Sequence, residues 1–170
     1  LLKKQSDAIR AQQQSFLQTW ADAFCDRDGA AIDSLCMDGA RKKMMKEQLL
    51  VIDEGDTIFG WSSPWPMWDT SDENSKGYTI TTSYDGKNTA EILYYAWTSD
   101  PHVTVWKEDI TFEERDGSYK VTDENIRFLD YIVSGTEFDE AYPQINGTPM
   151  DYTVNGMYDA LVMNSLLSSS

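Results

Sequence analysis

The sequence predicts an α+β fold in which N-terminal helices pack on a curved antiparallel sheet to form a cone. Two observations support this prediction. Apolar residues recur at helical spacing in the first part of the chain, and Asp28-Gly29 interrupts them. From Lys76 onward the apolar period changes to two, and turn-forming stretches separate the runs. This second pattern is typical of an antiparallel meander.

Two or three helices are expected before the sheet, packed on its concave face. The first spans residues 6–27, and Gly29 ends it. A second helix is predicted over 30–35 and a third over 40–50. The buried positions of the first two helices are expected to be Trp20, Phe24, Ile32 and Leu35. The third helix is expected to bury Met44, Met45, Leu49 and Leu50 and to expose Arg41, Lys42, Lys43 and Lys46.

A sheet of about four to six strands is predicted after the helices, and four of its strands can be placed. They span residues 78–84, 89–98, 102–114 and 119–133, with reverse turns between them. The run 89–98 is apolar on both of its faces. Such a strand is covered on both sides, so we expect it at a central position in the sheet.

Residues 54–70 differ in composition from the rest of the chain, because they contain Pro64, Pro66 and three tryptophans inside eight residues. Proline cannot donate to a strand ladder, so this stretch is predicted to be an irregular loop. Two interpretations of its tryptophans stay open. Exposed rings on a stiff loop would form a ligand platform, whereas buried rings would plug the open end of the sheet. The candidate binding residues are Trp61, Trp65, Trp68, Tyr95 and Trp97.

The length of 170 residues fits one main folded region. We expect residues 1–135 to hold the helices and the sheet. Residues 136–170 are interpreted as a C-terminal extension that packs on or beside the same domain, with a helix beginning near Asn155.

Charge restricts the expected partners. The chain has 29 acidic and 14 basic residues, which gives a formal net charge of −15. This field repels phosphate backbones and anionic lipid surfaces, so neither nucleic acid nor a bare membrane is an expected partner. No apolar run reaches the roughly 20 residues that a membrane helix needs, so no direct membrane insertion is expected.

The two cysteines flank the break between the first two helices. Cys25 lies near the end of the first, and Cys36 is expected in the second. A helical hairpin could bring them within bonding distance, but two small buried thiols in the helix interface fit the same pattern. With one histidine and no CxxC motif, no metal site and no cofactor is predicted.

No catalytic motif stands out, so no catalytic residue is assigned. The one histidine, His102, is expected at a solvated turn. An enzyme of the isomerase or dehydratase kind would instead need a strand carboxylate in an apolar pocket with a tyrosine donor nearby. The carboxylate candidates are Glu91, Glu108, Asp109, Glu113 and Asp123. The tyrosine candidates are Tyr78, Tyr94, Tyr95, Tyr119 and Tyr131.

The opening pattern FLQTWADAFCDRDGAAIDSL, followed by long strands, resembles the nuclear-transport-factor-2-like superfamily of α+β cones, which is related in shape to cystatin-like folds. Further stretches are similar to the extracytoplasmic C-terminal regions of membrane metallopeptidases of the β-lactam-sensor and antirepressor type from Gram-positive gut bacteria. These stretches are FGWSSPWP, SDPHVTVWKEDITFEERDGSYKV, SGTEFDEAYP and NGTPMDYTVNG.

The resemblance implies a non-enzymatic sensing or interaction domain on the bacterial cell surface or outside the cell, as part of a membrane-anchored signalling protein. The partners expected for a tryptophan surface at Trp61, Trp65 and Trp68 are a cell-wall glycan or peptide, or another protein domain. The alternative from the residues themselves is a small-molecule isomerase or dehydratase that uses a carboxylate in the cone pocket.

Overall fold

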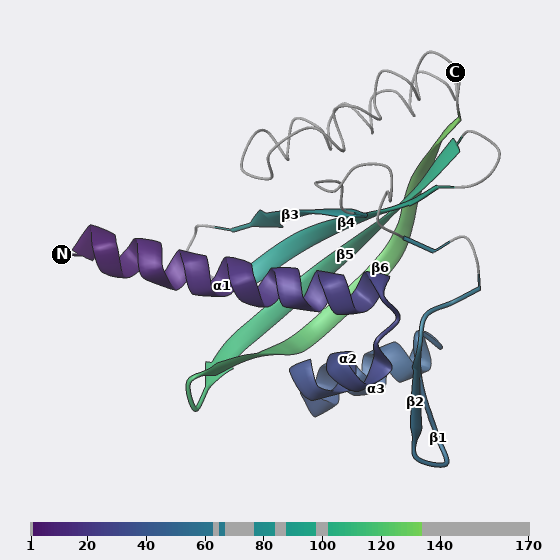
Figure 1. Ribbon diagram of the computed structural model, residues 1–170, viewed down its shortest axis with the longest axis horizontal. Helices are drawn as coiled ribbons and strands as arrows, with labels where there is room; N and C mark the ends of the chain where they lie inside the picture. The colour runs from purple at the N-terminus through teal and green to yellow at the C-terminus, as the bar shows by residue number, and fades with distance from the viewer. Residues whose placement is uncertain (1, 63–64, 67–76, 84–87, 98–101, 134–170) are drawn as a thin grey trace. The chain divides into compact units, whose positions relative to one another are not determined.

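The computed structural model describes residues 2–62, 65–66, 77–83, 88–97 and 102–133 of the chain (Figure 1). The described part is an α+β structure with three N-terminal helices followed by strands. The predicted class is therefore confirmed at the level of helices followed by an antiparallel sheet. The predicted extension 136–170 lies outside the described residues.

The helices are α1 (Leu2–Cys25), α2 (Gly29–Leu35) and α3 (Asp38–Lys46). Between α1 and α2, Arg27 adopts a positive φ of 56°. Asp28 then caps α2, because its carboxylate accepts a hydrogen bond of 3.1 Å from the backbone N–H of Ala31. The predicted break at Asp28-Gly29 is confirmed, although Gly29 begins α2 instead of only ending α1.

The third helix is shorter than predicted. Residue Gln48 has a φ of 60°, a left-handed conformation that stops a helix. The chain then forms the antiparallel hairpin β1 (Leu50–Asp53) and β2 (Asp56–Phe59). The sequence had predicted a third helix that ends at Leu50 and an irregular loop that begins at residue 54. Glu54 and Gly55 make the turn with φ values of 46° and 89°, the two positive angles that a tight two-residue hairpin requires.

The main sheet has the strand order β3-β4-β5-β6. Its strands are β3 (Tyr78–Thr82), β4 (Thr89–Trp97), β5 (His102–Arg115) and β6 (Ser118–Val133). All four predicted strands are present, with ends that differ by one or two residues. The central place of 89–98 is also confirmed, because β4 has β3 and β5 as neighbours and residues 92–96 are all buried.

The chain divides into two compact units, which we describe separately. Unit 1 comprises residues 1–61, 82–90 and 110–125. Unit 2 comprises residues 62–81, 91–109 and 126–170. Strands β3 to β6 each contribute residues to both units.

In unit 1, aromatic side chains join α1 to the β5–β6 turn region. The Phe16 ring lies 5.8 Å from that of Phe112 and 5.7 Å from that of Tyr119. At the end of α1, the Phe24 ring meets that of Phe59 edge to face at 5.1 Å. Buried residues of this unit include Leu17, Trp20, Phe24, Ile32, Met44, Phe59, Phe112 and Val121.

Most expected core positions of the helices are confirmed. Trp20, Phe24 and Ile32 have no exposed surface. Leu35, however, is half-buried, because it is the last residue of the short α2. Met45 is 43% exposed, because α3 buries the side that carries Ala40 and Met44.

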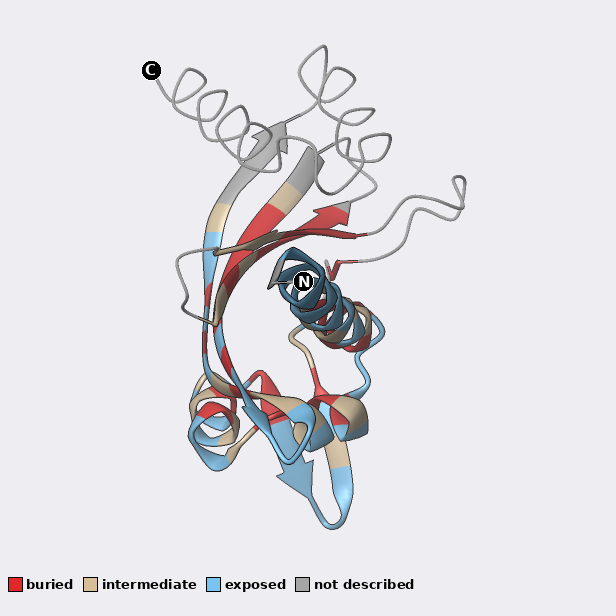
Figure 2. Cartoon of the chain, turned by 90° about the vertical axis from the view of Figure 1, so that its left-hand side faces the viewer, coloured by how far each residue is buried: buried red, intermediate tan, exposed pale blue. Residues whose placement is uncertain are grey.

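The first half of α1 has a different environment from the second. Residues 3–12 are all exposed, and they belong to the part of α1 beside the label N in Figure 2. From Leu17 onward the helix acquires its buried side. No described helix is both long enough and apolar enough to cross a membrane.

In unit 2, the segment of β4 supplies the core. Ile92, Tyr94, Tyr95 and Ala96 have no exposed surface, and Leu93 is 3% exposed. Trp65 lies edge to face with Trp106, with ring centroids 5.2 Å apart. The core of this unit therefore includes several large rings that carry a polar atom.

Candidate functional site

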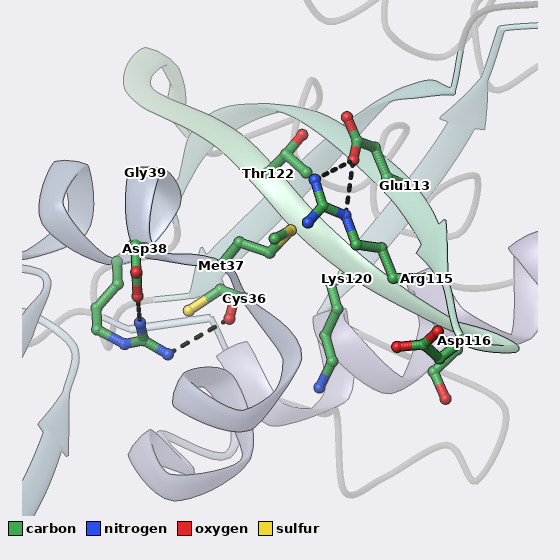
Figure 3. A pocket seen from close by; sticks show the side chains of 11 residues that line it. Cys36, Met37, Asp38, Gly39, Glu113, Arg115, Asp116, Lys120 and Thr122 are labelled. Atoms are coloured by element: carbon green, nitrogen blue, oxygen red, sulfur yellow. Dashed lines mark hydrogen bonds and ion pairs between the residues drawn. The ribbon is translucent and has the colours of Figure 1, made fainter.

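An open groove of about 710 Å³ lies in unit 1, between the α2–α3 connection and the β5–β6 turn (Figure 3). The connection contributes Cys36 and Met37, and the start of α3 contributes Asp38, Gly39 and Arg41. The strands and their turn contribute Glu113, Arg115, Asp116, Ser118, Lys120 and Thr122. This groove is our candidate binding site.

Strand alternation explains why this wall of the groove is polar. Successive side chains of a strand point to opposite faces. On β6, Ser118, Lys120 and Thr122 line the groove, whereas Tyr119 contacts Phe16 on α1 and Val121 is fully buried. The same strand thus contributes its apolar residues to the core and its polar residues to the groove.

A backbone connection fixes the opposite wall. Cys36 forms an isolated parallel bridge with Val121, and the N–H of Met37 donates to the Val121 carbonyl over 2.8 Å. The ammonium of Lys120 donates to the Ser34 carbonyl. The α2–α3 connection is therefore attached to one edge of β6 by main-chain and side-chain hydrogen bonds.

Arg41 organises the helical side of the groove. Its Nε donates to Asp33 Oδ1 and its Nη1 to Asp38 Oδ1, both over 2.5 Å. It also reaches the carbonyls of Asp33 and Cys36 through Nη2. The hydrogen bond to Asp33 raises the pKa of the Arg41 guanidinium. The side chain therefore keeps its positive charge and holds these contacts across the ordinary pH range.

The strand side of the groove carries positively and negatively charged side chains that are exposed. Arg115 donates from Nη2 to Glu113 Oε2 over 3.1 Å, and both side chains are more than half exposed. Asp116 is exposed in the turn that follows. Exposed ion pairs contribute little to stability, so a charged ligand can replace them at small cost.

The thiol of Cys36 is not an activated nucleophile. Its side chain is buried, and desolvation raises the pKa of this thiol, although the nearby Arg41 acts in the opposite direction. A nucleophilic cysteine needs a lowered pKa and access to solvent. Cys25 and Cys36 are both buried and form no disulfide, and Cys36 follows α2 instead of lying inside it.

Unit 2 contains the carboxylate–tyrosine combination that the enzymatic alternative requires. The Tyr94 hydroxyl donates to Glu108 Oε1 over 2.7 Å, and neither residue has any exposed surface. Nearby in sequence, the hydroxyls of Thr79 and Tyr95 are hydrogen-bonded at 3.1 Å, and burial raises the pKa of the Tyr95 phenol. These polar groups are packed in the core instead of facing the described groove.

The other four predicted carboxylates, Glu91, Asp109, Glu113 and Asp123, lie in exposed or half-exposed positions. Lys107, which is buried, places its ammonium 3.0 Å from Glu91 Oε1 and 3.7 Å from Asp109 Oδ1. Asp123 pairs with Lys43 of α3 at 2.9 Å, and this hydrogen bond raises the pKa of the Lys43 ammonium. Of the five predicted carboxylates, Glu113 lines the groove.

The predicted aromatic site falls on residues in different environments. Trp61 is half-buried, and its indole N–H donates to the Glu47 carbonyl over 3.1 Å. Trp65 is 6% exposed and Tyr95 is fully buried, so neither offers an open ring face. Trp68 lies outside the described residues, as do the side chains of Trp97, His102 and Tyr131.

Sequence reasoning named Glu113 as a carboxylate but did not find the groove. Its other lining residues are common surface types, and they converge only because Cys36 bridges to Val121, far along the chain. The alternation of Ser118, Lys120 and Thr122 with Tyr119 and Val121 was the available signal, since it marks one face of β6 as polar. No cluster of metal-binding side chains occurs in the described ranges.

Comparison with known proteins identifies no relative. No protein-family model, no curated protein and no solved structure matches the chain.

Proposed function

We propose that this chain is a non-enzymatic binding domain, and that the groove of unit 1 is its ligand site. The observation that supports this proposal best is the complete burial of Glu108, the strand carboxylate with a tyrosine donor. A general base must reach its substrate, and a carboxylate enclosed by packed side chains has no access to one. The Tyr94–Glu108 pair then acts as a buried polar link in the core.

The charges of the groove favour a peptide as the ligand class. Lys120 and Arg115 can bind carboxylates, and Glu113 and Asp116 can accept hydrogen bonds from ammonium groups. A peptide with free charged groups carries both. Uncharged glycans would hydrogen-bond to these side chains but would not neutralise their charges, so we place the peptide portion of a cell-wall ligand before its sugars.

The fold and location are part of the same proposal. We propose a cone of the nuclear-transport-factor-2-like type, because the helices and four-stranded antiparallel sheet are compatible with it. The sequence resemblance to the surface regions of sensor-type metallopeptidases supports an extracellular or cell-surface location in a bacterium. Labelling of intact source cells with an antibody against this chain tests the location, and labelling only after lysis contradicts it.

The binding proposal is tested by NMR titration of the ¹⁵N-labelled protein with muropeptides and with the sugar chain alone. We expect shifts at Ser118, Lys120 and Thr122 with the peptide-bearing ligand. The variant Lys120→Ala should weaken this response, and Lys42→Ala, at an exposed α3 position outside the groove, should leave it unchanged. Shifts that avoid the groove, or equal losses in both variants, would remove the groove from consideration.

The second candidate function is an isomerase or dehydratase, and the Tyr94–Glu108 hydrogen bond favours it. This candidate requires a conformation that opens the core around Glu108. Ketosteroid, lactone and hydroxyacyl substrates should be assayed with the wild type and with Glu108→Gln. Turnover that Glu108→Gln abolishes while the variant remains folded would replace the binding proposal with the enzymatic one.

A further inference from the structure

The β1–β2 hairpin exposes more apolar surface than its size explains. Val51 is 43% exposed, Ile52 44% and Ile58 56%. The hairpin is a separate two-stranded sheet. Its turn is the lowest loop in Figures 1 and 2, and Figure 2 colours it pale blue, the colour of exposed residues. Scattered single apolar residues on a surface are common, whereas neighbouring ones indicate an interaction site.

Strand register makes two of these side chains neighbours. Val51 lies directly opposite Ile58 in the ladder, so both point to the same face of the hairpin. Leu50 and Phe59, the adjacent pair, point to the other face and are buried at 1% and 2% exposure. One face of the hairpin therefore joins the core, and the Val51–Ile58 face remains in solvent.

The same solvent face carries an unfavourable charge arrangement. Asp53 lies directly opposite Asp56, and like charges in this position destabilise a strand pair. Glu54 adds a third carboxylate in the turn. Residues 50–60 contain no lysine or arginine, so the hairpin supplies no cation of its own.

We propose that this face of the hairpin docks an extended protein segment that carries apolar side chains and lysine or arginine together on one face, at every second position. The apolar residues of the segment would cover Val51 and Ile58, and its cations would neutralise Asp53, Glu54 and Asp56. This contact goes beyond the groove and uses none of the groove residues.

The three carboxylates of the hairpin also favour this partner over two others. A second hairpin of the same chain would place three carboxylates against three, which costs free energy. An anionic membrane surface would be repelled in the same way. The exposed start of α1 in another copy carries Ile9 with Lys3, Lys4 and Arg10, and we treat this self-association as an outcome of the test.

The test uses the full chain and a fluorescent eight-residue lysine–valine peptide, in which valine and lysine share every second position and serine fills the others, so that both lie on one face. Binding is followed by anisotropy at an ionic strength of about 0.15 M, where distant surface charges are screened. A lysine–serine peptide of the same length measures charge attraction without apolar contact. We expect the lysine–valine peptide to bind the wild type at least about tenfold more tightly than the lysine–serine peptide does.

Matched variants locate the contact. The double variant Val51→Thr and Ile58→Thr keeps β-branched side chains and should weaken lysine–valine binding about tenfold. Ile9→Thr, at the exposed apolar residue of α1, should leave lysine–valine binding unchanged.

The charge variants test the second part of the contact. Asp53→Asn with Asp56→Asn should weaken binding and flatten its salt dependence. Asp7→Asn with Glu114→Gln removes two exposed charges elsewhere and should do neither. Circular dichroism checks that each variant is folded.

Three results would overturn the proposal. Equal binding of the two peptides, or equal losses in the hairpin variants and their controls, would mean general attraction to an acidic protein. Concentration-dependent self-association that Ile9→Thr abolishes would assign the surface to a second copy. Loss of peptide binding in Lys120→Ala, with binding unchanged in the hairpin variants, would move the contact to the groove. A failure of the hairpin proposal is therefore distinguishable from a failure of the groove proposal.

Discussion

At the scale of single residues, burial determines the chemistry of the two cysteines. Cys25 and Cys36 are 7% and 5% exposed, and desolvation raises the pKa of the Cys36 thiol. Thiolate formation and reagent access are both needed for thiol exchange. The protection of these thiols is therefore a direct measure of whether the α1 end and the α2–α3 connection are packed as described.

We predict that neither thiol of the native protein reacts quickly with Ellman's reagent at about pH 8, and that both react at once in urea. Intact mass after alkylation in urea without reductant should show two modified cysteines. Rapid reaction of one thiol in the native state would mean that its surroundings open. A mass with neither cysteine modified would mean that the two are bonded.

A buried phenol makes stability sensitive to alkaline pH. Burial raises the pKa of Tyr95 above its ordinary value of 10.0, so the folded state keeps the proton that the unfolded state releases. Its contribution to stability is fully present below about pH 10 and is lost as pH rises above that value. The variant Tyr95→Phe removes this loss because it has no proton to release.

The measurement is the urea midpoint of the wild type and Tyr95→Phe at about pH 8 and about pH 11. At the lower pH the variant should be less stable by about 0.5–1.5 kcal/mol, since Thr79 loses its hydrogen-bond partner. At the higher pH this gap should narrow or reverse. A gap that is the same at both values would show that Tyr95 ionises equally in the folded and unfolded states.

At the scale of elements, the sequence predicted the long periodic helix and strands well, but it did not predict the short hairpin or the end of α3. The helix α1 and strands β4 to β6 carry long apolar patterns, so their existence and approximate ends followed from spacing. The hairpin β1–β2 was missed because it has only four residues in each strand, and because Leu49 and Leu50 continued the helical pattern. What ends α3 is the left-handed backbone of Gln48, and glutamine gives no signal for it.

The groove was missed for a related reason. Its geometry depends on the bridge from Cys36 to Val121, a contact between residues that are far apart in sequence. Local patterns indicate which face of a strand is polar, but they do not indicate which distant segment lies beside it. Conversely, the tyrosine partner of a strand carboxylate was among the predicted candidates, and Tyr94 with Glu108 confirms that combination while placing it in the core.

The contact between α2 and β2 gives a prediction for a whole element. A Cβ atom at Gly29 would lie 2.4 Å from the carbonyl oxygen of Thr57, closer than packed atoms allow. Gly29→Ala should therefore force α2 and β2 apart and lower the free energy of unfolding by about 1–3 kcal/mol, although alanine is the better helix former. Urea denaturation measures this change.

Gly39→Ala is the comparison, because Gly39 lies in the first turn of α3 and its Cβ would approach the Thr122 carbonyl at 3.3 Å. We expect a smaller loss there, since a shift of a few tenths of an ångström relieves the contact and helix propensity offsets part of the cost. A stabilised Gly29→Ala protein would show that α2 does not approach β2 at this point.

At the scale of the whole molecule, net charge is the dominant electrostatic feature. The chain has a formal net charge of −15, because its 29 acidic residues outnumber its 14 basic ones. The described ion pairs lie mostly at partly exposed positions. Exposed pairs contribute about 0–1 kcal/mol each, whereas repulsion among excess carboxylates acts on the entire folded state. Folding concentrates this charge, so repulsion favours the unfolded chain.

We therefore predict that salt stabilises the protein. Raising sodium chloride from about 0.02 M to about 0.5 M shortens the screening length from about 20 Å to about 4 Å, which weakens the repulsion more than it weakens close ion pairs. The urea midpoint should rise, and it should rise further in Lys43→Gln, which adds one net negative charge and removes the partner of Asp123. A midpoint that falls with salt would mean that local ion pairs such as Arg41 with Asp33 outweigh the net charge, and Arg41→Gln should then abolish the salt dependence.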